Sequence, residues 1–209
     1  MRSIPAAAAL LMLALPAPRA NAQVPGGGEF LDLVRRADVI FAGTVSDAQC
    51  TRVPAGIVTR ITFKRLAYVK GSGPEDSLIV RRDGGTLGAE TTLSDDQPGF
   101  CVGERCVLLA KGDPGSPRNG YTPFAGVSEA VFRLFEDSPK KKPVVHTSTG
   151  TPVGAVTGGR LVLAVDENAE RRMSEKAFLD ALRRIVREQE RPDPERPNSE
   201  GPGRADTLR

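Results

Sequence analysis

The feature that most constrains this sequence is an alternation of apolar and polar residues with a period of two, which recurs in separate segments along the chain. This period is typical of β-strands, because successive side chains of a strand point to opposite faces. Turn residues separate the segments: 22 glycines and 17 prolines among 209 residues argue against a long helical bundle. We therefore expect a mainly β fold. The expected strands are residues 38–46, 57–68, 77–82, 105–110, 121–124 and 130–135.

The second expected strand contains one irregularity. Its inward apolar residues run in phase as far as Phe63, but Leu66 and Tyr68 continue the pattern one position out of phase. One extra residue in a strand forms a β-bulge, which bends the strand and increases its twist. The sequence therefore predicts a bulge near Lys64 and Arg65. Bent strands favour a small closed barrel of about five strands, similar to the oligosaccharide/oligonucleotide-binding (OB) barrel, with an open two-sheet sandwich as the alternative.

After residue 136 the pattern changes to a hairpin and a helix. Gly158-Gly159 predicts a two-residue turn between strands at 153–156 and 161–165, because glycine tolerates the positive φ of such turns. One helix is expected from Ser174, a good N-cap, to about Glu188. Its apolar residues recur at spacings of three and four and predict packing on the barrel. A helix that binds a partner is the alternative. The expected stripe is Met173, Ala177, Phe178, Ala181, Leu182, Ile185 and Val186.

The two ends of the chain differ in character from the body. Residues 1–22 have a positive start, a short apolar run and the sequence Ala20-Asn21-Ala22, which is typical of a cleaved secretory signal peptide. The run of about 12 residues is shorter than the roughly 20 that span a membrane. We expect a protein of the periplasm or the extracellular space, without stable membrane insertion. After the signal peptide, we expect three parts: an OB-like barrel (30–136), a hairpin with a docked helix (137–190) and a disordered tail (191–209).

The residues provide little catalytic chemistry. The chain has one histidine, His146, which we expect on the solvated surface, and we expect no catalytic, metal-binding or cofactor-binding residues. In a protein exported from the cytoplasm, cysteines are expected to form disulfides. The spacing favours a disulfide between Cys101 and Cys106, although three pairings are possible and Cys50 competes for either partner.

Three segments resemble the netrin-type module, the OB-like barrel of the tissue inhibitors of metalloproteinases. They are Ala37–Val45, Tyr68–Gly71 and Phe100–Ala110, which has the module's aromatic, Gly-Glu and apolar-strand pattern. The chain also resembles a group of uncharacterised secreted bacterial proteins that combine this barrel with a helix. The inhibitors chelate the zinc of a protease through an N-terminal cysteine, whereas the expected mature chain begins at Gln23. The resemblance therefore implies the fold and not that mode of inhibition.

Three classes of function remain after these observations. The first is a secreted, non-enzymatic binding module that modulates another protein, and it predicts an exposed apolar or aromatic patch near the barrel loops. The second is a structural or envelope-accessory protein without a small ligand. The third class, a hydrolase, is the least favoured, because no pair of nucleophile and general base stands out in the sequence. We exclude nucleic acid as a partner, because proteins that bind it use a positively charged groove. Cleavage of the expected signal peptide would remove Arg2 and Arg19, and the remaining chain would have 27 basic residues against 26 acidic ones. The expected partner is an unidentified protein.

Overall fold

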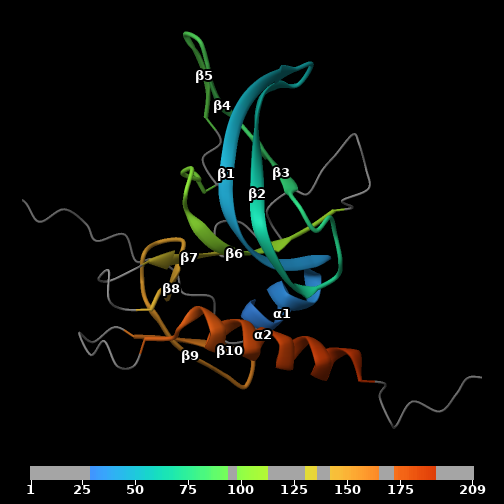
Figure 1. Cartoon of the computed structure of the whole chain (residues 1–209), viewed down its shortest axis with the longest axis vertical. Helices are drawn as coiled ribbons and strands as arrows, with labels where there is room; N and C mark the ends of the chain where they lie inside the picture. Colours follow the sequence, from blue (N-terminus) through green and yellow to red (C-terminus); the bar gives the residue numbers. More distant parts are fainter. Residues whose placement is uncertain (1–28, 94–97, 113–129, 136–141, 165–171, 192–209) are drawn as a thin grey trace, which may run out of the picture.

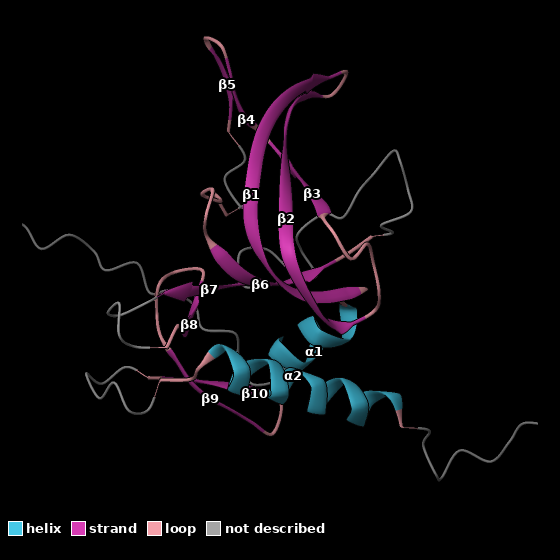
Figure 2. Ribbon diagram, viewed as in Figure 1, coloured by secondary structure: helices cyan, strands magenta, loops and turns pink. Residues whose placement is uncertain are grey.

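The computed structural model describes residues 29–93, 98–112, 130–135, 142–164 and 172–191. This part of the chain forms a large antiparallel sheet with two helices on one side of it (Figures 1 and 2). The elements are α1 (Glu29–Arg36), β1 (Val39–Val53), β2 (Gly56–Lys70), β3 (Leu78–Asp83), β4 (Gly85–Leu87), β5 (Glu90–Thr92), β6 (Arg105–Ala110), β7 (Val131–Phe135), β8 (Val144–Thr147), β9 (Val153–Thr157), β10 (Arg160–Leu163) and α2 (Glu175–Glu190). The expected signal peptide, the expected strand at 121–124 and the expected tail beyond Arg191 lie outside the described residues.

The prediction of a closed barrel of about five strands is wrong for the described residues. The main sheet has six strands in the order β3-β2-β1-β6-β7-β8, and no pairing joins its two end strands. The loop at Pro98 and Gly99 forms hydrogen bonds with both β3 and β7. Arg82 of β3 donates to the Pro98 carbonyl at 3.3 Å, and Arg133 of β7 donates to the neighbouring Gly99 carbonyl at 2.6 Å. The loop at Pro98 and Gly99 therefore links β3 to β7 without a strand pair between them in the described residues.

The predicted bulge is confirmed. The register of β1 and β2 shifts between the pairs Ala42–Ala67 and Thr44–Lys64, so that Arg65 and Leu66 of β2 lie opposite the single residue Gly43 of β1. Arg65 has a φ of 53°, the left-handed region that non-glycine residues seldom adopt. Both long strands are strongly curved in Figure 1, as expected from the local increase in twist at a bulge.

The two faces of the sheet bury different apolar clusters. The helix face packs against α1, α2 and the β9–β10 hairpin. The opposite face, which we call the loop face, buries a cluster around Phe41 and Phe63. Phe100, from the loop before β6, packs edge-on against Phe63, with 5.8 Å between the ring centroids. Strand β6 is buried on both faces, in agreement with its continuous apolar sequence. Strand β1 also buries both faces where it pairs with β6.

Helix α2 packs its apolar stripe on the helix face. The Ser174 side chain accepts a hydrogen bond from the Ala177 amide and caps the helix, as its sequence position indicates. Phe178 lies against Phe132 of β7 at 4.8 Å and Phe30 of α1 at 6.3 Å between centroids. The stripe differs from the expected one because Ala177 is exposed and Leu179 is buried. Neither α2 nor any other helix in the described ranges is long and apolar enough to span a membrane.

Two elements were not predicted in their observed form. The short helix α1 buries Phe30, Leu33 and Val34, whose spacing of three and four is helical. Strands β4 and β5 form a small hairpin between the expected strands at 77–82 and 105–110, and an ion pair between Arg52 and Glu90 joins it to β1. The hairpin of β9 and β10 has the predicted turn, with φ values of 57° and 73° at its two glycines.

Candidate functional site

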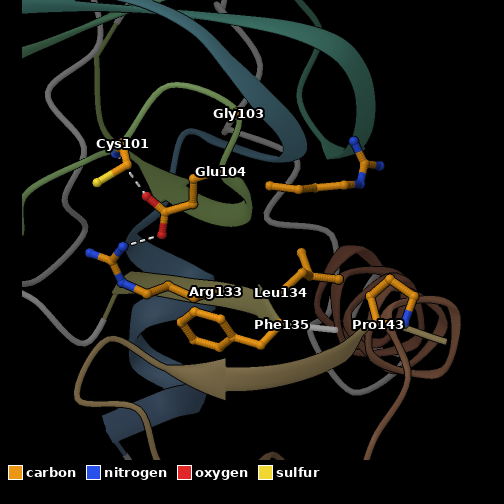
Figure 3. Close-up of a pocket in the computed structure, with 8 residues that line it drawn as sticks. Cys101, Gly103, Glu104, Arg133, Leu134, Phe135 and Pro143 are labelled. Carbon is orange, nitrogen blue, oxygen red and sulfur yellow. Dashed lines mark hydrogen bonds and ion pairs between the residues drawn. The ribbon is translucent and has the colours of Figure 1, made fainter. Parts of the chain in front are cut away.

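A groove beside β7 is the candidate site. Its volume is about 440 Å³, within the range of about 300–1,000 Å³ typical of ligand sites. The walls come from the loop before β6 and the first residue of β6, from β7 and from the residue before β8, as Figure 3 shows. Eight residues line this groove, which we call the β7 groove: Cys101, Gly103, Glu104, Arg105, Arg133, Leu134, Phe135 and Pro143.

One wall of the groove is held by a nearly buried ion pair. The Arg133 guanidinium donates to the Glu104 carboxylate, and the side chains are only 17% and 10% exposed. The second carboxylate oxygen of Glu104 accepts a hydrogen bond from the Cys101 amide at 3.1 Å, as drawn in Figure 3. Arg133 also donates to the Gly99 carbonyl. These bonds fix the loop before β6 against β7 and neutralise both charges.

A second ion pair ties the groove to the helix and the bulge. Arg105 donates to both oxygens of Glu175 in the first turn of α2, at 2.6 to 3.1 Å. The same guanidinium donates to the Thr44 hydroxyl at 3.4 Å and to the carbonyl of the bulge residue Arg65 at 3.3 Å. Arg105 is therefore engaged on all sides and holds α2, β1 and β2 together.

The open part of the groove is apolar. Phe135 remains 43% exposed although it ends a strand whose other apolar residues are buried. Val102, between two lining residues of the loop, is 66% exposed. Of the other apolar lining residues, Pro143 is half-buried and Leu134 is buried (Figure 3). The exposed apolar side chains here are therefore Phe135 in the groove and Val102 on the loop that forms part of its wall.

His146 does not lie on the solvated surface, so that expectation is wrong. It is 8% exposed, and its Nδ1 donates to the Gly150 carbonyl at 3.0 Å, because a carbonyl oxygen can only accept. Its ring contacts Phe135 edge-on at 5.0 Å between centroids. The register pairs it with Arg133, and directly paired residues share a face of the sheet. His146 therefore supports the groove from behind Phe135.

The cysteines are free thiols in this structure. Cys101 is exposed on the groove, Cys106 is completely buried on the loop face, and Cys50 is half-buried at 3.5 Å from the Thr59 hydroxyl. The disulfide expected between Cys101 and Cys106 is not formed in the structure, and it stays a prediction for the oxidised protein. Burial, with a smaller contribution from the Glu104 carboxylate, raises the pKa of the Cys106 thiol far above its ordinary value.

This burial predicts a loss of stability at alkaline pH. The Cys106 thiol ionises near its ordinary pKa of 9.0 in the unfolded chain but stays protonated in the folded one. The folded state then binds more protons, so the stabilisation present below pH 9 is lost as the pH rises further, at up to about 1.4 kcal/mol per pH unit. Desolvation also raises the pKa of the Tyr68 hydroxyl and acts in the same direction above its ordinary value of 10.0.

Urea unfolding of the reduced protein between pH 8 and 10.5, followed by circular dichroism, measures this loss. We expect Cys106→Ala to reduce the slope of unfolding free energy against pH above pH 9. The matched variant Cys101→Ala removes an exposed thiol and should keep the wild-type slope. Equal slopes for Cys106→Ala and the wild type would contradict the assignment.

Sequence reasoning missed the groove itself. Glu104 was noticed only within the Gly-Glu pattern of the netrin resemblance, and Arg133 not at all. A signal for Arg133 does exist, because it is the single charge in the apolar strand Val131–Phe135, and a charge buried in a sheet requires a partner. The identity of that partner depends on the loop that crosses the face.

The charged side chains of the β7 groove are engaged in ion pairs. Glu104 pairs with Arg133 and Arg105 with Glu175, and Phe135 is the exposed apolar side chain among the lining residues. Comparison of the chain with protein-family models and with curated proteins finds no match.

Proposed function

We propose that this chain is a non-enzymatic binding module of the periplasm or the extracellular space, and that its binding site is the β7 groove. The half-exposed aromatic ring of Phe135 beside a hollow of about 440 Å³ carries the proposal. Phenylalanine, like tyrosine and tryptophan, is enriched in protein–protein interfaces relative to the rest of the protein surface. The ion pairs around the ring pre-organise the walls, so that little conformational entropy is lost on binding.

The netrin-type resemblance supports the same site. Its most specific segment, Phe100–Ala110, contains four of the eight residues that line the groove. In this proposal the curled sheet is an open relative of that module, and the loop before β6 provides the binding wall. The signal-peptide pattern in residues 1–22 supports the proposed location.

A capture experiment with matched variants tests the proposal. The exported chain, carrying an affinity tag, is cross-linked in an envelope extract of the source organism, and recovered proteins are quantified by mass spectrometry. We expect Phe135→Ser to lower the recovery of a specific partner by about tenfold or more, because truncating a central aromatic contact typically costs 2 kcal/mol or more. Phe135 is 43% exposed, so the fold should persist, which circular dichroism checks.

Val162→Ser is the matched control. Val162 is 48% exposed on β10 and does not line the groove, so recovery should stay at the wild-type level. If both variants recover the same proteins as the wild type, the groove is not the binding site, and a structural or envelope-accessory role becomes the better proposal.

A further inference from the structure

The charge at the rim of the β7 groove restricts what can bind there. Arg133 is neutralised by Glu104 and Arg105 by Glu175. Lys142, directly before the lining residue Pro143, is exposed and has no ion pair with any described residue. Among the described residues, Lys142 is therefore a positive charge without an ion pair, one position from the lining residue Pro143. Complementary charge at a rim steers association and selects partners.

The apolar surface restricts the occupant further. The polar groups in the walls already have partners, so a ligand gains little from polar atoms placed at the bottom of the groove. An aromatic or large aliphatic side chain set against Phe135 gains both apolar burial and ring contact. Val102, between the lining residues Cys101 and Gly103, is also exposed, which extends the exposed apolar residues beyond those that line the hollow. This extension favours a polypeptide segment over a small molecule.

We infer that the β7 groove binds a partner polypeptide through an aromatic or large aliphatic side chain that lies next to an acidic residue, with the acidic residue at Lys142. This inference rests on the proposed function and names the chemistry of the partner. The apolar side chain supplies the affinity, and the carboxylate supplies the selectivity. A rim pair of this kind is screened by salt, so the preference for acidic segments should diminish at high ionic strength.

The composition of the chain provides a direct measurement, because it contains no tryptophan. Tryptophan emission, excited selectively, therefore reports only on an added peptide. The probes are Ac-Glu-Trp-Leu-Glu-NH2, its lysine counterpart Ac-Lys-Trp-Leu-Lys-NH2, and N-acetyltryptophan as a small carboxylate. With the full exported chain under reducing conditions, we expect the acidic peptide to shift to shorter wavelength and to bind about fivefold more tightly than the basic peptide.

Three variants make the test specific. Phe135→Ser should abolish the spectral shift, and Lys142→Glu should remove or invert the preference for the acidic peptide. Arg60→Glu changes the net charge equally but lies on the part of β2 that pairs with Gln49, and it should preserve the preference. Bound acidic peptide should also slow alkylation of Cys101, the exposed thiol on the groove.

Equal affinities for the acidic and basic peptides, or an unchanged preference in Lys142→Glu, would overturn the inference. N-acetyltryptophan binding as tightly as the acidic peptide would assign the groove to small molecules instead. If no peptide binds while protein capture still depends on Phe135, this inference fails and the proposed function stands. If neither protein capture nor peptide binding depends on Phe135, both the proposed function and this inference are wrong.

Discussion

Leu182→Ala is expected to lower the free energy of unfolding of the whole described fold by about 2–5 kcal/mol. Leu182 is completely buried on α2, in the cluster that α2 forms with α1 and the helix face of the sheet. The substitution removes apolar atoms and leaves a cavity that the sheet below cannot fill without moving. Because a helix of this length is marginal in isolation, the loss should affect sheet and helix together.

Urea unfolding followed by circular dichroism measures this effect, and Leu93→Ala is the matched control. It deletes the same atoms from a leucine that is 81% exposed, so the free energy should change by no more than about 0.5 kcal/mol. Equal stabilities for Leu182→Ala and the wild type would mean that α2 leaves the sheet in solution. The alternative that this helix binds a partner would then regain support.

Arg133→Met is expected to destabilise the protein by about 3 kcal/mol. Methionine retains much of the apolar stem but leaves the Glu104 carboxylate, only 10% exposed, with the Cys101 amide as its remaining partner. An uncompensated charge in a nearly buried position is costly, because water no longer solvates it. The Gly99 carbonyl also loses its donor, so the loop before β6 should loosen.

Two further variants separate the charge from the loss of packing. Arg52→Met breaks an ion pair of the same type whose side chains are 57% and 51% exposed, and it should destabilise the protein far less than Arg133→Met, because water screens the exposed pair. Replacing Glu104 by Leu in the Arg133→Met background removes the stranded charge, and it should restore much of the stability. Similar losses for Arg133→Met and Arg52→Met would show that the Glu104–Arg133 pair is solvated in solution.

Several elements of the fold were predictable because they depend on residues close together in the chain. The phase change after Phe63 located the bulge, since a period of two leaves no other position for an extra residue. Ser174 marked the start of α2, because its hydroxyl satisfies an amide of the first turn. The glycine pair at 158 and 159 marked the β9–β10 turn through its positive φ.

The candidate site was not predictable in the same way. Periodicity indicates which residues share a face of a strand, but it does not indicate what covers that face. His146 follows two valines and looks like a surface residue, yet the turn at Gly150 and the ring of Phe135 enclose it. Arg133 finds its partner in Glu104, 29 positions earlier in the chain. No local pattern relates these two residues.

By itself, the sequence determined the local conformations of this protein: the alternating strands, the bulge, the cap of α2 and the tight turn. Each of these is decided by dihedral preferences and spacings over a few residues. Only the tertiary structure decided that the curled sheet stays open in the described residues, that a loop crosses between β3 and β7, and that paired charges surround an exposed Phe135. These outcomes depend on contacts between distant segments, in which burial and charge pairing across the fold outweigh local preference.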